Sequence, residues 1–175
     1  SIRRQRQMCI RDSRSAERGA AGFQRFANPA VDRDTAEPIY IYDRLDEPCT
    51  GLLEETLAFA EKGERAVCFG TGMSAISAAI GIHVRQGDHV IYHPAIYGCT
   101  YSHITNWLSR FGVESSAVRF VDVELLRGAI RPETRVIFFE SPCNPTMELV
   151  DIEALVRLVK EVNSTRSEDQ KVVTI

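Results

Sequence analysis

The chain lacks the usual signs of a membrane-spanning, disulfide-bonded or nucleic-acid-binding protein. Among its 175 residues, no apolar run approaches the roughly 20 residues that cross a bilayer. Its five cysteines are scattered without a C-x-x-C pair, so the sequence indicates neither a disulfide framework nor a zinc site. The formal net charge of −3 argues against a nucleic-acid surface, which needs clustered excess Lys and Arg. These absences favour a cytoplasmic protein that binds small molecules, without metal, membrane or nucleic acid.

The composition divides the chain into an arm and one domain. With 44% apolar and 26% charged residues, it is typical of a soluble globular protein. We interpret residues 1–50 as an N-terminal arm and residues 51–175 as part of a ligand-binding domain. Residues 1–15 differ in composition from everything that follows and resemble translated read-through sequence, so we exclude them from the fold assignment.

From residue 51 onward, short apolar strands alternate with helices. Apolar residues at helical spacing predict a helix over about 52–60, ended by Gly63 in a left-handed conformation. The pattern predicts strands at 65–69, 89–93, 112–118, 135–140 and 171–175, and helices at 73–85 with Gly87 as the stop, at 100–110, and at 151–162 with Asp151 as the cap. This alternation predicts an α/β fold with a mostly parallel sheet and a binding crevice at the carboxyl ends of its strands.

A glycine loop, "GTGMSA" at residues 70–75, fits the dinucleotide pattern G-x-G-x-x-G/A between a predicted strand and a predicted helix. A dinucleotide fold also needs a carboxylate at the end of its second strand, where this chain has Tyr92-His93-Pro94. No Lys-Ser or Lys-Thr pair follows the glycines, which excludes a P-loop. Two interpretations remain: a tight structural turn, or a helix N-terminus that binds another phosphate ligand.

Four motifs occur in a familiar order: "YDR" at 42–44, the glycine loop, "YGCT" at 97–100 and "ESPCNPT" at 140–146. With them, the chain from about Tyr40 to Ile175 resembles the Cys/Met-metabolism family of pyridoxal-phosphate enzymes. The resemblance implies an aspartate-aminotransferase-like (type I) fold with three layers, truncated in this chain, and pyridoxal 5'-phosphate as the cofactor.

The resemblance also implies how the phosphate of the cofactor is bound. Backbone amides of the loop Thr71-Gly72-Met73 would bind it. Tyr42 and Arg44 would bind the phosphate of the neighbouring subunit's cofactor, and the planar fork of Arg suits a phosphate group. The implied assembly is a homodimer that pairs into a homotetramer.

Three further residues match family positions around the cofactor ring. Tyr97 matches the tyrosine that stacks on the pyridine ring and assists proton transfer, which makes it the candidate catalytic residue. Glu140 and Asn144 match positions near the cofactor, and the asparagine would contact the phenolic oxygen of the ring. Cys99 stands where methionine γ-lyases carry a cysteine.

The implied function is that of a carbon–sulfur lyase acting on sulfur-containing amino acids, similar to methionine γ-lyase or cystathionine γ-lyase. A first alternative is γ-replacement, as in cystathionine γ-synthase or an O-acylhomoserine sulfhydrylase. A second is a non-catalytic α/β domain that binds a phosphate ligand. The family's Schiff-base lysine and the aspartate that pairs with the pyridine nitrogen would lie beyond Ile175, so we expect an incomplete and inactive fragment.

Overall fold

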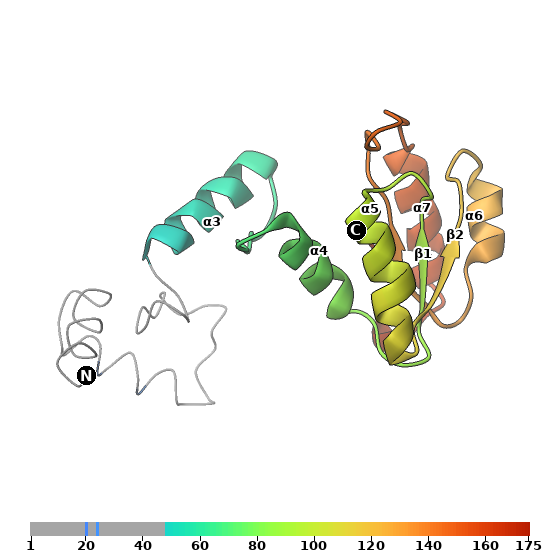
Figure 1. Cartoon of the computed structure of the whole chain (residues 1–175), viewed down its shortest axis with the longest axis horizontal. Helices are drawn as coiled ribbons and strands as arrows, with labels where there is room; N and C mark the ends of the chain where they lie inside the picture. The colour runs from blue at the N-terminus through green and yellow to red at the C-terminus, as the bar shows by residue number, and fades with distance from the viewer. Residues whose placement is uncertain (1–19, 21–23, 25–47) are drawn as a thin grey trace. The chain divides into compact units, whose positions relative to one another are not determined.

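The computed structural model describes residues 20, 24 and 48–175, which form parts of two compact units, Ser1–Cys68 and Phe69–Ile175. In the first unit, helix α3 covers Pro48–Glu61 (Figure 1). Lys62, not Gly63, takes the left-handed conformation after the helix, with a φ of 55°. The amide of Gly63 donates to the carbonyl of Ala58 at 2.9 Å, which is the Schellman pattern with Lys62 one position earlier than predicted.

The strand predicted at 65–69 is wrong. These residues form no strand in the part of the chain that the structure describes, and Val67 is 70% exposed. The amide of Cys68 instead donates to the carboxylate of Glu54 at 2.7 Å. A strand exists only where a neighbouring strand takes its amides and carbonyls, and an apolar run cannot supply that partner by itself.

The second unit has a parallel sheet of four strands, which confirms the predicted fold class. The strands are β1 (His89–Tyr92), β2 (Glu114–Ala117), β3 (Thr134–Phe138) and β4 (Val173–Thr174). Their order is β2-β1-β3-β4, and each neighbouring pair is parallel. The chain therefore leaves β1 toward one edge of the sheet and returns to β3 on the other side of β1, so the strand order reverses between β1 and β3.

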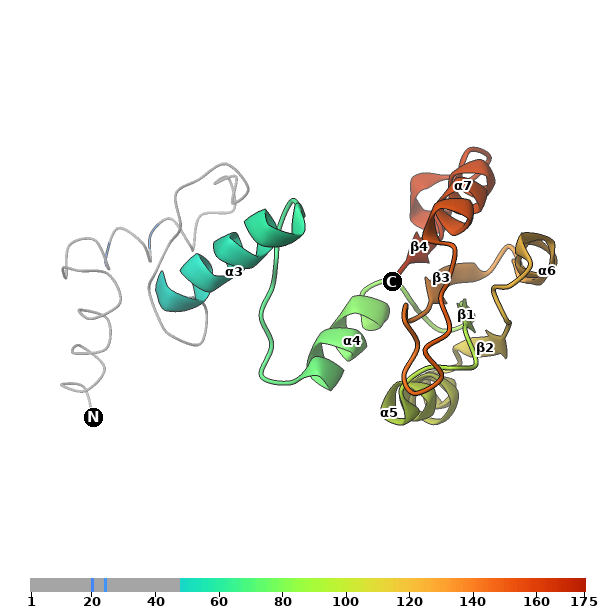
Figure 2. The ribbon, with the colours of Figure 1, turned by 90° about the horizontal axis from the view of Figure 1, so that it is seen from above.

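Helices cover both faces of this sheet (Figure 2). They are α4 (Gly72–Gly81), α5 (Gly98–Ser102) continued by a π-helical turn (His103–Trp107) and a 3-10 turn (Leu108–Phe111), α6 (Val123–Ala129), α7 (Ile152–Asn163) and a 3-10 turn at Glu168–Gln170. α5 lies on one face, and α6 and α7 lie on the other. The longest helix among the described residues is α3 with 14 residues, and none there has the length and apolarity of a membrane span.

Alternating side chains along the central strands divide the core into two layers. Val90 of β1 and Val136 of β3 pack with Ile104 on the α4–α5 face. Ile91 and Ile137, the next residues along the same strands, pack on the α6–α7 face. All of these side chains are at most 1% exposed, as the two-residue period of a strand buried on both faces requires.

Helix α4 ends at Gly81, earlier than the predicted end at residue 85. The carboxylate of Asp88 accepts the Arg85 amide at 2.8 Å, and a side chain that binds the backbone in this way competes with continued helix. Gly87, predicted as the stop, has a φ of +89° and lies in the turn between Arg85 and Asp88.

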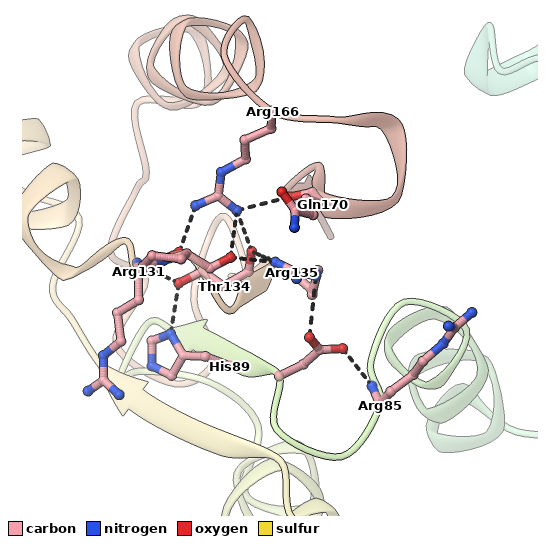
Figure 3. A network of polar contacts seen from close by, with 9 residues as sticks. Arg85, His89, Arg131, Thr134, Arg135, Arg166 and Gln170 are labelled. Carbon is pink, nitrogen blue, oxygen red and sulfur yellow. Dashed lines mark hydrogen bonds and ion pairs between the residues drawn. The ribbon is translucent and has the colours of Figure 1, made fainter.

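Arg166, just after α7, binds the loops at the amino ends of β3 and β4 (Figure 3). Its guanidinium donates to the carbonyls of Arg131 at 2.6 Å, Thr134 at 2.8 Å and Gln170 at 3.0 Å. Burial lowers the pKa of Arg166, and nearby Arg135 lowers it further. The guanidinium of Arg166 therefore connects the loop before β3 with the loop before β4.

Candidate functional site

The candidate site lies at the carboxyl ends of β1 and β3, where the strand order reverses. The segments that leave these two strands pass to opposite faces of the sheet, one to α5 and the other to α7. In open α/β sheets such a switch point forms the ligand-binding crevice. The predicted residues Tyr97, Glu140 and Asn144 all lie in segments that leave these strand ends.

The N-terminus of α4 carries the predicted phosphate loop. Thr71 is the N-cap, and its side-chain oxygen accepts the amide of Ser74 at 3.1 Å. Gly72 and Met73 begin the helix, and amides of a first helical turn have no intrahelical carbonyl to bind. A Cβ placed on Gly72 would meet no atom within 4 Å, so protein packing does not require this glycine. Open space beside unsatisfied amides fits an anionic group.

A contact between two side chains joins the starts of α4 and α5. The hydroxyl of Thr100, which is fully buried, donates to Sδ of Met73 at 3.8 Å. Thr100 lies in the first turn after Tyr97, whose carbonyl accepts the amide of Tyr101 at 2.9 Å. The loop predicted to bind phosphate and the residue predicted to stack on the cofactor ring therefore belong to one connected region.

Tyr97 is the N-cap residue of α5 and is 47% exposed. Its backbone amide donates to Oε1 of Glu140 at 2.9 Å, so the segment after β1 is bound to the segment after β3. A side-chain hydrogen bond with Cys99 raises the pKa of the Tyr97 phenol, and the charge interaction with the same residue raises it further. The phenol is therefore protonated at neutral pH, with its ring accessible.

The segment "ESPCNPT" forms a turn with two cis peptide bonds, Ser141–Pro142 and Asn144–Pro145. The hydroxyl of Ser141 accepts the amide of Val150 at 3.1 Å, which closes the turn. Asn144 is exposed in this turn. The structure thus binds Glu140 to Tyr97 and leaves Asn144 accessible.

Tyr42 and Arg44 fall outside the described residues. Two residues of the segments after β1 and β3 that the sequence did not indicate, His93 and Cys143, are buried. The one feature of the sequence that could have indicated them is position: His93 ends the predicted strand at 89–93, and Cys143 lies within "ESPCNPT".

Comparison with solved structures gives the class of protein that this fold and site define. The chain aligns with a putative O-acetylhomoserine (thiol)-lyase from Campylobacter jejuni at a TM-score of 0.69 and 33% identity, covering 79% of this chain and 32% of that one. That structure contains a pyridoxyl-lysine monophosphate group. The class is therefore that of pyridoxal-phosphate enzymes with a parallel α/β fold.

Curated relatives agree with this class. The chain is 40% identical over 119 residues to L-methionine gamma-lyase of Fusobacterium nucleatum subsp. polymorphum, which covers 68% of this chain and 30% of the relative. It is 43% identical over 122 residues to cystathionine beta-lyase MetC of Bacillus subtilis, which covers 70% and 31%. The chain thus spans about a third of the length of these relatives.

The model of the Cys/Met metabolism PLP-dependent enzyme family matches residues 19–172. The chain belongs to this family, as its four motifs predicted. The family depends on pyridoxal phosphate, which confirms the predicted cofactor.

Proposed function

We propose that the whole protein containing this chain is a pyridoxal-phosphate-dependent carbon–sulfur lyase that acts on sulfur-containing amino acids. The similarity to a methionine gamma-lyase and a cystathionine beta-lyase supports elimination as the reaction. The structural observation that carries the proposal is the convergence of the α4 N-terminus with the Tyr97–Glu140 contact at one edge of the sheet. We also propose a cytoplasmic location, as the composition indicates.

The start of α4 would bind the phosphate of the cofactor. Amides of Gly72 and Met73 would donate to its oxygens, with the positive end of the helix dipole behind them. The Thr71 hydroxyl is already engaged with Ser74, at 2.8 Å between the two hydroxyl oxygens, so it would hold the loop in shape as well as contact the ligand. Backbone amides that point outward from a helix N-terminus can donate several hydrogen bonds to one doubly charged phosphate.

Tyr97, Glu140 and Asn144 would surround the ring of the cofactor, which supplies an electron sink when bound. The exposed face of Tyr97 offers an aromatic surface for stacking, and its protonated phenol can donate a proton from Oη. Glu140 would hold Tyr97 in place through the backbone. The amide of Asn144 is accessible to donate to a ring oxygen.

The proposed assembly is a homodimer that pairs into a homotetramer, with Tyr42 and Arg44 reaching the cofactor of the neighbouring subunit. Each site would then need two subunits. Arg44→Ala tests whether this residue serves subunit assembly or cofactor binding. Gel filtration measures assembly, and titration with pyridoxal phosphate measures cofactor binding. We expect unchanged assembly and weaker cofactor binding.

The test uses the full-length protein. After reconstitution with pyridoxal phosphate, we expect a visible absorption band that borohydride abolishes, and release of thiol from methionine or cystathionine supplied alone. A protein without the band would contradict the cofactor assignment. A protein with the band that releases no thiol, but joins O-acylhomoserine to a thiol, would contradict the lyase assignment.

Replacement at the γ-carbon is the second candidate. It is favoured by the similarity to the putative O-acetylhomoserine (thiol)-lyase, whose structure covers 79% of this chain. Assays with O-acylhomoserine in the presence and absence of a thiol co-substrate distinguish replacement from elimination.

A further inference from the structure

His93 is a polar side chain buried directly beneath the candidate site. It follows β1, is 2% exposed, and its backbone amide donates to the carbonyl of Phe138 at 3.0 Å, which continues the pairing of β1 with β3. Its ring packs edge-to-face on Phe120, with ring centroids 5.3 Å apart. Both nitrogens of a buried imidazole need polar partners, so the groups around the His93 ring indicate its role.

The Nδ1 atom of His93 organises the segment after β1. It accepts the amide of Ala95 at 3.2 Å, two positions along the chain, as an Asn or Asp side chain does in an Asx turn. Because Nδ1 accepts this bond, the proton of the neutral ring lies on Nε2, which faces the carboxylate of Glu148 at 3.7 Å. Tyr97 follows Ala95 by two residues, so the turn at Ala95 sets its position.

The same nitrogen contacts the segment after β3. Sγ of Cys143 lies 3.7 Å from His93 Nδ1, and the thiol donates to the carbonyl of Glu140 at 3.0 Å. The amide of Cys143 donates to the carbonyl of Glu148 at 2.9 Å, and both residues belong to the turn that contains Asn144. Because the thiol donates its proton to the Glu140 carbonyl and Nδ1 carries none, the sulfur meets the His93 ring in a packing contact and joins it in this way to Glu140.

We propose that His93 is a positioning residue that, with Cys143, fixes the segments carrying Tyr97 and Glu140 in register with each other. One ring nitrogen holds the turn leading to Tyr97, and the sulfur beside it holds the turn that begins at Glu140. The Tyr97–Glu140 hydrogen bond then closes the connection at the surface. That these two residues serve the cofactor rests on the proposed function; the connection itself does not.

Cys143 and His93 are not arranged as a nucleophile and its base. The thiol is fully buried, so no substrate reaches it. Burial raises the pKa of Cys143, and the carboxylates of Glu148 and Glu140 raise it further, so the thiolate is disfavoured. A neutral thiol that donates to a carbonyl is a structural contact.

Two amide substitutions at His93 test the proposal, because each keeps one nitrogen's role. His93→Asn places an acceptor near Nδ1 and preserves the Asx-type turn at Ala95. His93→Gln places its amide nearer Nε2 and loses that turn. In the full-length protein we measure alkylation of Cys143 by iodoacetamide, peptide by peptide. We expect Cys143 in His93→Gln to be labelled about two- to tenfold faster than in the natural protein, because the hydrogen bond from the Ala95 amide is lost. In His93→Asn we expect a rate near that of the natural protein.

The matched control is His89→Gln, at the amino end of the same strand. His89 is equally buried and binds Thr134 and Ser116. We expect it to lower the melting temperature without accelerating Cys143 labelling under native conditions. Equal labelling rates in His93→Asn and His93→Gln would overturn the proposal.

A second readout follows the cofactor. The visible circular dichroism of bound pyridoxal phosphate should change in His93→Gln and be preserved in His93→Asn. If the natural protein binds no pyridoxal phosphate, the proposed function fails while the labelling result still decides the role of His93.

Should either His93 variant fail to fold, Cys143→Ser and Cys143→Ala test the connection from the other side. Serine keeps a donor for the Glu140 carbonyl, and alanine does not. Chymotryptic cleavage after Tyr97 reports how well its segment is held. We expect faster cleavage in Cys143→Ala than in Cys143→Ser; equal rates would contradict the proposal.

Discussion

The backbone amide of Tyr97 donates a hydrogen bond to the carboxylate of Glu140 at 2.9 Å, although the two residues are 43 positions apart. This bond joins the segments that leave β1 and β3 at the point where the strand order reverses. It places two of the residues predicted to surround the cofactor beside each other, and the ring of Tyr97 remains 47% exposed.

Removing the Glu140 acceptor should weaken cofactor binding. Glu140→Ala loses the bond to the Tyr97 amide, and we expect a cost of about 1–2 kcal/mol in the binding of pyridoxal phosphate. Glu140→Gln keeps an oxygen at the same place and should lose less. Titration of the cofactor-free full-length protein with pyridoxal phosphate measures both. A glutamine variant as weak as the alanine variant would show that charge, not the backbone contact, is what matters.

A methyl group at Gly72 should hinder the phosphate without harming the fold. Gly72→Ala places a Cβ where no protein atom lies within 4 Å, and alanine is favoured over glycine in helices by up to about 1 kcal/mol. We therefore expect unchanged or slightly higher stability together with weaker cofactor binding. Gly81→Ala, at the other end of α4 and equally open, is the matched control and should bind normally. Equal affinity of the two variants would argue against a phosphate at the helix N-terminus.

Acidification should destabilise the protein through His89 and His103. Burial lowers the pKa of His89, with Arg131 adding to the effect against the weaker influence of Glu114 and Glu133, and burial also lowers the pKa of His103. The unfolded chain then binds more protons, so this stability is fully present above about pH 6.5 and is lost as the pH falls below that value. Thermal unfolding between pH 7.5 and 5.5 measures the loss.

The variant His89→Gln should flatten this pH dependence, since an amide cannot be protonated in that range. The part that remains should disappear on adding His103→Gln. An unchanged slope in the double variant would assign the effect to other groups.

Replacing Arg166 should loosen the amino edge of the sheet. Arg166→Lys cannot reach the carbonyls of Arg131, Thr134 and Gln170 together, so we expect a loss of about 1–3 kcal/mol in the free energy of unfolding. Differential scanning calorimetry measures the shift. Arg157→Lys, whose pair with Glu153 lies on the exposed face of α7, should leave the melting temperature unchanged. Similar shifts in both variants would mean that the carbonyl cluster contributes little.

Local patterns were enough to predict most of the sheet and its helices. The apolar run before Glu140 forms β3, and Asp151 caps α7 with its carboxylate on the amide of Ala154 at 2.9 Å. Helix α6 was missed because its seven residues span only two turns, too few for a helical period to emerge. The segment 65–69 was wrongly predicted as a strand, since its apolar residues carry no information about a pairing partner.

By itself, the sequence determined the family, the cofactor, the parallel α/β arrangement and the order of the motifs. Each of these follows from short motifs or from local apolar patterns, which can be recognised without knowing which segments are neighbours in space. Tertiary structure alone decided that Tyr97 binds Glu140 and that the ring of His93 meets Cys143, pairs separated by 43 and 50 positions. Such contacts depend on which strands become neighbours and in what register, and the pairing of strands is a property of the whole sheet rather than of any segment within it.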